Sequence, residues 1–228
     1  MAAQHRHGTI KIMMEEIVKT ETLKQTKVYH ALCNLWMKKA RMEDRKLGVD
    51  FAAWVENSAS LHGNKYQPST DGLKKVLDKL PVKDTDVIVD IGCGKGKAMY
   101  LMSHFPFAYI DGIEFSNDLV KVAQENFKTL QLPQCTAMQA DAAEFERYDD
   151  CNYFYIFNSF PRAVFRKMLN HILYSLAKNP RKIYFIYLNP VCHDMLMETG
   201  VFKLLFRKRH LIRWFQYYCY TNMEGTNG

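Results

Sequence analysis

The feature that most constrains this chain is a short apolar run that leads directly into a glycine-rich turn. Residues 87–91 read Val-Ile-Val-Asp-Ile, and Gly92-Cys-Gly-Lys-Gly follows at once, ahead of a segment with helical character. Glycine lets the backbone turn sharply and approach a ligand closely. Because such a turn joins a strand to a helix, we expect a ligand site outside the carboxyl end of the strand, near the helix N-terminus.

The chain around this turn alternates between strand-like and helix-like segments, which is typical of a parallel sheet covered by helices on both faces. The expected strands are 87–91, 108–114, 135–140, 151–158, 182–188, 201–206 and 211–220. Helices are expected over 71–80, from the glycine turn to 104, and over 118–130, 162–177 and 192–198. The last two strands lie too close together for a crossover helix, so we expect them to pair antiparallel.

The N-terminal part has a different pattern. Residues 10–56 contain no proline, and their apolar residues recur at roughly helical spacing, which predicts two or three amphipathic helices. Gly63-Asn-Lys-Tyr-Gln-Pro then interrupts that pattern. We therefore expect an N-terminal helical extension or cap over 1–62 and a ligand-binding domain over 63–228.

The spacing of the glycines narrows the class of ligand. A phosphate-binding P-loop needs glycine five positions before Gly96, where Ile91 stands, and Ser or Thr where Ala98 stands. A dinucleotide fingerprint needs its third glycine at position 97, which is lysine. The sequence thus argues against both a P-loop and a nicotinamide-dependent oxidoreductase.

Two acidic residues stand where later strands end. Glu114 closes the second expected strand, 22 residues after Gly92, where a carboxylate can accept hydrogen bonds from both ribose hydroxyls. Asp141 follows the third strand, where a short acid can contact an adenine amino group. The alternatives are a surface glutamate at a strand end and an aspartate that caps its own loop.

Together these segments resemble a family. Asp90-Ile-Gly-Cys-Gly-Lys-Gly, Gly112-Ile-Glu-Phe-Ser and Ala140-Asp141 are similar to motifs I, II and III of the class I S-adenosylmethionine-dependent methyltransferases. The resemblance implies a Rossmann-like α/β fold, with a seven-stranded, mostly parallel sheet of order 3-2-1-4-5-7-6 and an antiparallel last strand. It also implies S-adenosyl-L-methionine as the cofactor and S-adenosyl-L-homocysteine as the product.

The resemblance further implies a role for each motif residue. Asp90 would hold the cofactor's amino group, the glycine turn would border its methionine part, Glu114 would bind the ribose and Asp141 the adenine. The implied cofactor-binding set is Tyr66, Asp90, Gly92, Cys93, Gly94, Gly96, Glu114, Phe115, Asp141, Ala142 and Asn158. Tyr66 enters because Tyr66-Gln-Pro-Ser is similar to a Tyr-x-Pro-Ser/Thr segment that packs over the cofactor in some members, although a purely structural role is an equal alternative.

The implied acceptor end of the site follows the fourth strand. Asn158-Ser-Phe160-Pro resembles the Asn-Pro-Phe form of motif IV in small bacterial members and differs from the Asn-Pro-Pro-Tyr/Phe form used on adenine and glutamine amino groups. We expect Asn158 to position the acceptor and Phe160 to wall the pocket. His193 is a candidate base because histidine titrates near neutral pH; a helix cap or a surface histidine is the alternative.

Composition bounds the remaining possibilities. The six cysteines form no C-x-x-C pair and show no zinc spacing, so we expect no metal and a reducing, cytoplasmic location. Neither a signal peptide nor an apolar run long enough to span a membrane is evident. The net charge of +7 is compatible with nucleic acid as a partner, and Arg207-Lys-Arg-His reads as a basic hairpin tip.

The sequence therefore predicts a methyltransferase that moves a methyl group to an unidentified acceptor, whether a protein side chain, RNA or a small molecule. It predicts a monomer or a dimer. The alternative is a non-catalytic cofactor- or RNA-binding protein on the same fold, because fold alone does not fix activity.

Overall fold

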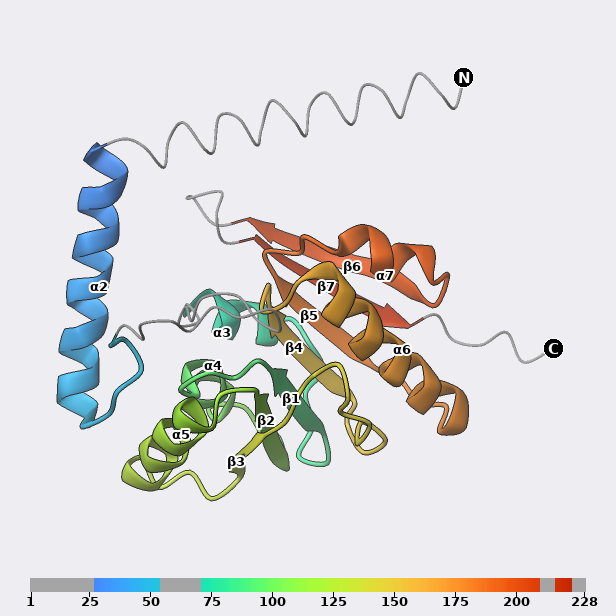
Figure 1. Ribbon diagram of the computed structural model, residues 1–228, viewed down its shortest axis with the longest axis horizontal. Helices are drawn as coiled ribbons and strands as arrows, with labels where there is room; N and C mark the ends of the chain where they lie inside the picture. Colours follow the sequence, from blue (N-terminus) through green and yellow to red (C-terminus); the bar gives the residue numbers. More distant parts are fainter. Residues whose placement is uncertain (1–26, 54–70, 210–215, 223–228) are drawn as a thin grey trace. The chain divides into compact units, whose positions relative to one another are not determined.

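The computed structural model describes residues 27–53, 71–209 and 216–222 (Figure 1). The chain divides into two compact units, Met1–Glu43 and Asp44–Gly228. The described part of the first unit is helix α2 (Lys27–Leu47), whose last residues belong to the second unit. The expected boundary between residues 62 and 63, and the helices expected before Lys27, lie outside the described residues and stay predictions.

The second unit is built on one seven-stranded sheet. Its strands are β1 (Val87–Ile91), β2 (Tyr109–Glu114), β3 (Cys135–Gln139), β4 (Tyr153–Phe157), β5 (Tyr184–Leu188), β6 (Phe202–Arg209) and β7 (Gln216–Asn222). They lie in the order β3-β2-β1-β4-β5-β7-β6, and β7 pairs antiparallel with both of its neighbours. The predicted fold class, strand order and antiparallel last strand are confirmed.

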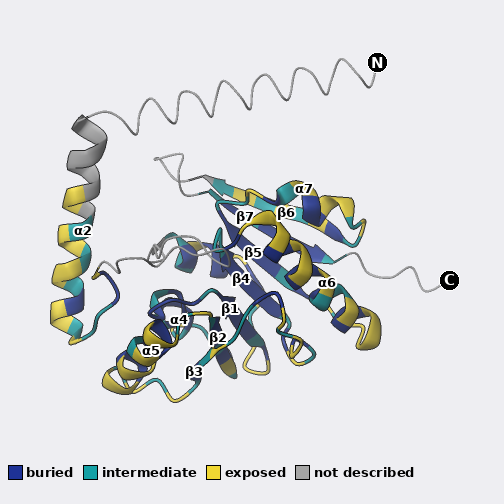
Figure 2. Cartoon of the chain, viewed as in Figure 1, coloured by how far each residue is buried: buried dark blue, intermediate teal, exposed yellow. Residues whose placement is uncertain are grey.

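Helices cover both faces of this sheet. They are α3 (Lys74–Leu77), preceded by the 3-10 turn η1 (Asp71–Leu73), α4 (Lys97–Met102), α5 (Asn117–Thr129), α6 (Arg162–Lys178) and α7 (His193–Glu198). One apolar cluster joins the sheet to α3, α4 and α5, and a second joins it to α6 and α7. Figure 2 shows the strands as a buried layer between these helices. Burial on both faces explains the unbroken Tyr-Phe-Tyr-Ile run of β4.

The sheet register brings three connecting loops to one edge. Ile91 at the end of β1 pairs with Ile113 of β2 and with Ile156 of β4. The amides of Gly92 and Cys93 both donate to the Ile113 carbonyl, at 2.8 and 3.0 Å. Because parallel strands end at the same edge, the glycine turn, the residue that closes β2 and the loop after β4 are neighbours.

The prediction of a hairpin tip at Arg207-Lys-Arg-His is wrong for its first three residues. Arg207, Lys208 and Arg209 are part of β6, paired with Tyr218, Tyr217 and Gln216. Ladder hydrogen bonds extend the strand through this charged run, and charged side chains are well tolerated on a strand that, like β6, ends the order of the described strands. Residues 210–215 lie outside the described part of the chain.

Within the described ranges, 27–53, 71–209 and 216–222, no helix combines the length and the apolar character needed to cross a bilayer.

Candidate cofactor-binding and active site

Packing within the protein requires glycine at two positions of the turn. Gly92 and Gly96 have φ values of +84° and +83°, in the left-handed region that favours glycine. A Cβ on Gly92 would lie 2.6 Å from the Ser159 hydroxyl, and one on Gly96 would lie 2.4 Å from the Phe127 ring. The turn is therefore held closely between the loop after β4 and helix α5.

Glu114 connects the glycine turn to the end of β2. Its two carboxylate oxygens accept hydrogen bonds from the amides of Gly94 and Ser116, both at 3.0 Å. Burial raises the pKa of Glu114, and these backbone hydrogen bonds lower it in part. The Glu114 carboxylate thus lies at the turn, while its contact with a ribose stays a prediction.

Asp90 supplies a second carboxylate on the neighbouring strand. It is the fourth residue of β1 and only 2% exposed. Burial raises its pKa well above the ordinary value, and the negative charge of Glu114 raises it further. A ligand with positive charge would relieve this repulsion and favour the ionised form of both acids.

The side chains of Cys93 and Phe115 lie in different environments. A Cβ on Gly112 would lie 2.8 Å from the Cys93 sulfur, so the Cys93 side chain points into the core between the sheet and α4. Its backbone, rather than its thiol, lies in the turn. Phe115 follows β2 and is 47% exposed, an aromatic ring at the same edge of the sheet as the turn.

Asp141 caps its own loop. Its Oδ1 accepts the Ala143 amide at 2.8 Å, and its carbonyl accepts the Glu144 amide at 3.0 Å. Ala142 is buried in the apolar cluster on the α6 side. The loop-capping alternative is therefore observed for Asp141, while its contact with adenine stays a prediction.

The loop after β4 packs directly on the glycine turn. A Cβ on Gly92 would lie 3.4 Å from the Phe160 ring, and the Ser159 hydroxyl donates to the Ile91 carbonyl at 3.3 Å. Asn158 has a φ of +37°, which is uncommon for a residue other than glycine. Such backbone conformations cluster at functional sites. The structure therefore packs Ser159 and Phe160 against Gly92, and Asn158 directly precedes them. The roles of Asn158 and Phe160 at the acceptor stay predictions.

His193 follows β5 and packs against strand β7. It begins α7, and its Nδ1 lies 2.8 Å from the hydroxyl of Tyr220 on β7. Tyr220 pairs with Phe185, three residues before the end of β5 at Leu188. The His193 ring also lies 5.3 Å from that of Tyr218, which pairs with Tyr187 one residue before the end of β5, so His193 lies near the carboxyl end of β5, the strand next to β4. Burial lowers the pKa of His193, and the charge of Arg207 lowers it further.

A buried lysine in the turn was not predicted as a site residue. The Lys95 ammonium lies 2.7 Å from the Asp50 carboxylate and 3.0 Å from the Ala53 carbonyl. The Asn126 amide group donates to the carbonyls of Lys95 and Asp50, both at 3.0 Å, and accepts the Asp50 amide at 2.9 Å. This network fixes segment 48–53 and α5 to the glycine turn.

The same segment is braced from its other end. The Asp44 carboxylate accepts the amides of Phe51 and Ala52, at 2.8 and 2.6 Å. Phe51 is buried, and its ring stacks on Tyr100 of α4 with centroids 5.6 Å apart. The Asp44 contacts are local, but the Phe51–Tyr100 and Lys95–Asp50 contacts join residues more than 40 positions apart, so no local motif could have indicated those two.

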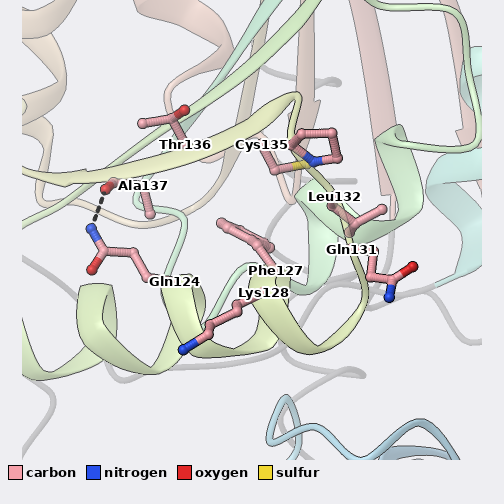
Figure 3. A pocket seen from close by; sticks show the side chains of 9 residues that line it. Gln124, Phe127, Lys128, Gln131, Leu132, Cys135, Thr136 and Ala137 are labelled. Atoms are coloured by element: carbon pink, nitrogen blue, oxygen red, sulfur yellow. Dashed lines mark hydrogen bonds between the residues drawn. The ribbon is translucent and has the colours of Figure 1, made fainter.

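A separate hollow of about 570 Å³ lies between the end of α5 and the start of β3 (Figure 3). Phe127, Lys128, Leu132 and Cys135 are among its lining residues, and Gln124 donates to the Ala137 carbonyl at 3.1 Å. None of the predicted site residues lines it. It borders the amino-terminal end of β3, whereas the predicted residues follow the carboxyl ends of the strands.

Two further predictions concern Tyr66 and metals. Tyr66, with the rest of the Tyr-x-Pro-Ser segment, lies outside the described residues, so its cofactor contact stays a prediction. Among the residues that the structure places, no group of three His, Cys, Asp or Glu side chains is arranged to hold a metal ion.

Comparison with known proteins bears on this geometry. Residues 88–179 match the family model of the methyltransferase domain. This segment runs from β1 to the end of α6 and contains the glycine turn, both carboxylates and the loop after β4. The match agrees with the predicted domain class, a methyltransferase domain.

Relatives and solved structures add detail. The chain is 37% identical over 81 residues to the ribosomal RNA large subunit methyltransferase G of Shewanella pealeana and to that of Shewanella halifaxensis. Each match covers 35% of this chain and 19% of the relative, so the chain spans about a fifth of the relatives' length.

Two solved structures share the fold of the methyltransferase domain. An RNA methyltransferase from Salinibacter ruber in complex with S-adenosyl-L-homocysteine matches with a TM-score of 0.54 and 20% identity, covering 70% of this chain and 95% of that one. A SAM-dependent methyltransferase from Aquifex aeolicus matches with a TM-score of 0.51 and 12% identity, covering 65% and 88%. At these identities the likeness shows the fold.

Proposed function

We propose that this protein transfers the methyl group of S-adenosyl-L-methionine to RNA. The observation that carries the proposal is the pair of carboxylates, Asp90 and Glu114, held at a glycine turn that opens a helix. The methyltransferase domain match, the printed activity of the Shewanella relatives and the net charge of +7 support the acceptor class.

The chemistry of the cofactor fits this pair. S-adenosyl-L-methionine carries an ammonium and a sulfonium, and its sulfonium supplies an already activated methyl group. Asp90 would hold the ammonium, and the backbone of the turn would border the methionine part. Glu114 would bind the ribose while it keeps the turn closed through the Gly94 amide. Phe115, Asp141 and Ala142 would surround the adenine.

The acceptor end is formed by the loop after β4. Asn158 would orient the acceptor through its side-chain amide, and Phe160 would exclude water from the reacting groups. Alignment of the two reactants is the main contribution the protein makes, because no covalent intermediate with the enzyme is needed. His193 is the candidate base, and its lowered pKa keeps it neutral at pH 7 and able to accept a proton.

Calorimetry with ligand-stripped protein tests the cofactor site. We expect Glu114→Ala to weaken binding of S-adenosyl-L-homocysteine by about 1–3 kcal/mol, because ribose hydroxyls lose their acceptor. Glu125→Ala, at an exposed position of α5, is the matched control and should bind normally. Since Glu114 also holds the turn, thermal unfolding of each variant must be measured beside its affinity. Unchanged affinity in Glu114→Ala would contradict the site.

Transfer of radiolabelled methyl tests the acceptor. Cell lysate from which the endogenous protein is absent is incubated with labelled cofactor and purified protein, then separated into RNA, protein and small molecules. We expect label in the RNA pool. Label confined to protein or small molecules would refute the RNA acceptor, and binding of the cofactor with no transfer to any pool would favour the non-catalytic alternative.

A further inference from the structure

Strand β6 has a bulge between Leu204 and Phe206. At this bulge, the alternation of its side chains between the two faces of the sheet is reversed. Phe202 and Leu204 pack in the apolar cluster on the α6 side, whereas Phe206 packs in the cluster on the α3 side. A bulge inserts one extra residue and so reverses the alternation of side chains along a strand. Lys208, two residues after Phe206, consequently lies on the α3 side of the sheet edge.

Three lysines gather there: Lys75, Lys79 and Lys208, which we call the lysine cluster. The Lys79 ammonium lies 5.4 Å from the centre of the Phe206 ring, so it is held over β6. Partial burial lowers the pKa of Lys208, and the positive charges of Lys75 and Lys79 lower it further, against the opposing charge of Asp78. The Lys208 ammonium is therefore close enough to those of Lys75 and Lys79 to be repelled by both.

The sheet register gives the position of this cluster relative to the acceptor loop. Lys208 pairs with Tyr217, Tyr217 with Leu188, and Leu188 with Phe157, the residue before Asn158. The row crosses three strand-to-strand steps of about 4.8 Å each, or roughly 14 Å. The lysine cluster and the loop after β4, which contains Asn158, thus lie at the same end of the strands. Strand β6 is the outermost strand on this side of the sheet (Figure 1).

We propose that the lysine cluster binds backbone phosphates of the RNA whose acceptor nucleotide is presented to Asn158. The inference rests on the proposed function and adds to it the surface that holds the substrate. Folding holds three like charges together, so a polyanion that neutralises them is bound favourably. Lysine ammonium groups bind phosphate as point charges and release counterions from nucleic acid. A ligand that reaches both this cluster and Asn158 must extend about 14 Å along the edge, as a nucleic acid strand does.

The test is fluorescence anisotropy with a labelled 20-nucleotide single-stranded RNA of mixed sequence, at several salt concentrations. We expect the combined substitution Lys75→Ala, Lys79→Ala and Lys208→Ala to weaken binding at least about 10-fold at 0.1 M salt. The salt dependence should also become shallower by about 2, because three phosphate contacts each contribute about 0.7 for a single strand.

A control variant removes the same charge elsewhere. It combines substitutions at three lysines of α5 and α6, Lys121→Ala, Lys128→Ala and Lys167→Ala. Two of these lysines already form ion pairs, Lys121 with Asp118 and Lys167 with Glu144. We expect the RNA affinity of this control variant to fall less than about 3-fold, the size of effect expected from the loss of net positive charge alone. Both variants should keep the wild-type melting temperature and calorimetric affinity for S-adenosyl-L-homocysteine.

Three results would overturn the inference. These are unchanged RNA affinity in the cluster variant, an equal loss in the control variant, and wild-type binding to vesicles of anionic phospholipid without binding to RNA. Failure of the proposed function is separate, because it would appear as absent cofactor binding or absent methyl transfer by the wild-type protein. The anisotropy measurement contains no cofactor and is unaffected by that outcome.

Discussion

The Lys95 ammonium lies 2.7 Å from the Asp50 carboxylate, although only 4% of the Lys95 side chain is exposed against 45% of the Asp50 side chain. A buried ammonium is costly unless it is paired and hydrogen-bonded. The pair therefore places segment 48–53 at the glycine turn and holds the turn against movement. Removing either partner should affect the turn as well as stability.

We expect Asp50→Asn to lower the free energy of unfolding by about 1–3 kcal/mol, because the buried Lys95 charge loses its counterion. Lys95→Met removes the charge itself, so the double variant should be less destabilised than the sum of the single ones. Urea denaturation of the four proteins measures this coupling. Strictly additive losses would show that the pair has no energetic coupling.

Substitution of Gly96 should lower the free energy of unfolding more than substitution of Gly200, a glycine with a similar backbone conformation. Gly96 and Gly200 have φ values of +83° and +68°, but only the Gly96 Cβ would meet a neighbour, the Phe127 ring at 2.4 Å. We expect Gly200→Ala to cost about 1–2 kcal/mol from backbone strain alone. Gly96→Ala should cost more and weaken cofactor binding. Equal melting temperatures for the two variants would contradict the packing argument.

Asp90→Asn should stabilise the ligand-free protein at neutral pH while it weakens cofactor binding. The pKa of Asp90 is raised in the folded state, so the folded protein binds more protons than the unfolded chain between pH 3.8 and that raised value. The free energy of unfolding therefore falls as pH rises through this range. The asparagine variant should lack this component of the pH dependence, as measured by melting from pH 4 to pH 8.

Cofactor affinity should have the opposite pH dependence. A cationic ligand binds the ionised carboxylates, so affinity should rise with pH as Asp90 and Glu114 lose their protons. Calorimetry across the same pH range measures this trend. Affinity that is independent of pH in the wild-type protein would argue against a direct contact between these acids and a positive charge.

His193→Gln separates a catalytic role from a structural one, since glutamine can keep a hydrogen bond to Tyr220. If His193 is the base, methyl transfer should fall by about 10²-fold or more while cofactor affinity is unchanged. Its folded-state pKa is lowered below 6.5, so the unfolded chain binds more protons as pH drops below that value. Stability should therefore fall on acidification in the wild type, and less in the variant. Full transfer activity in His193→Gln would exclude the catalytic role.

Local patterns in the sequence determined the fold and the position of the glycine turn in it. The apolar run before Gly92, the alternation of segments and the short spacing of the last two strands specify a parallel sheet with one antiparallel strand. Glu114 and Asn158 could be placed at the same edge because strand ends in a parallel sheet are neighbours by construction. Each of these inferences depends on residues close together in the chain.

Tertiary structure alone decided what surrounds that turn. Asp50, Lys95 and Asn126 are separated by 31 to 76 positions, so no sequence motif with a fixed spacing could have predicted their network. The bulge that directs Lys208 toward Lys75 and Lys79 depends on how β6 pairs with β7, and the same pairing extends the strand through the basic run. Buried charges, strand register and side-chain packing are set by partners distant in sequence, which is why only the folded chain reveals them.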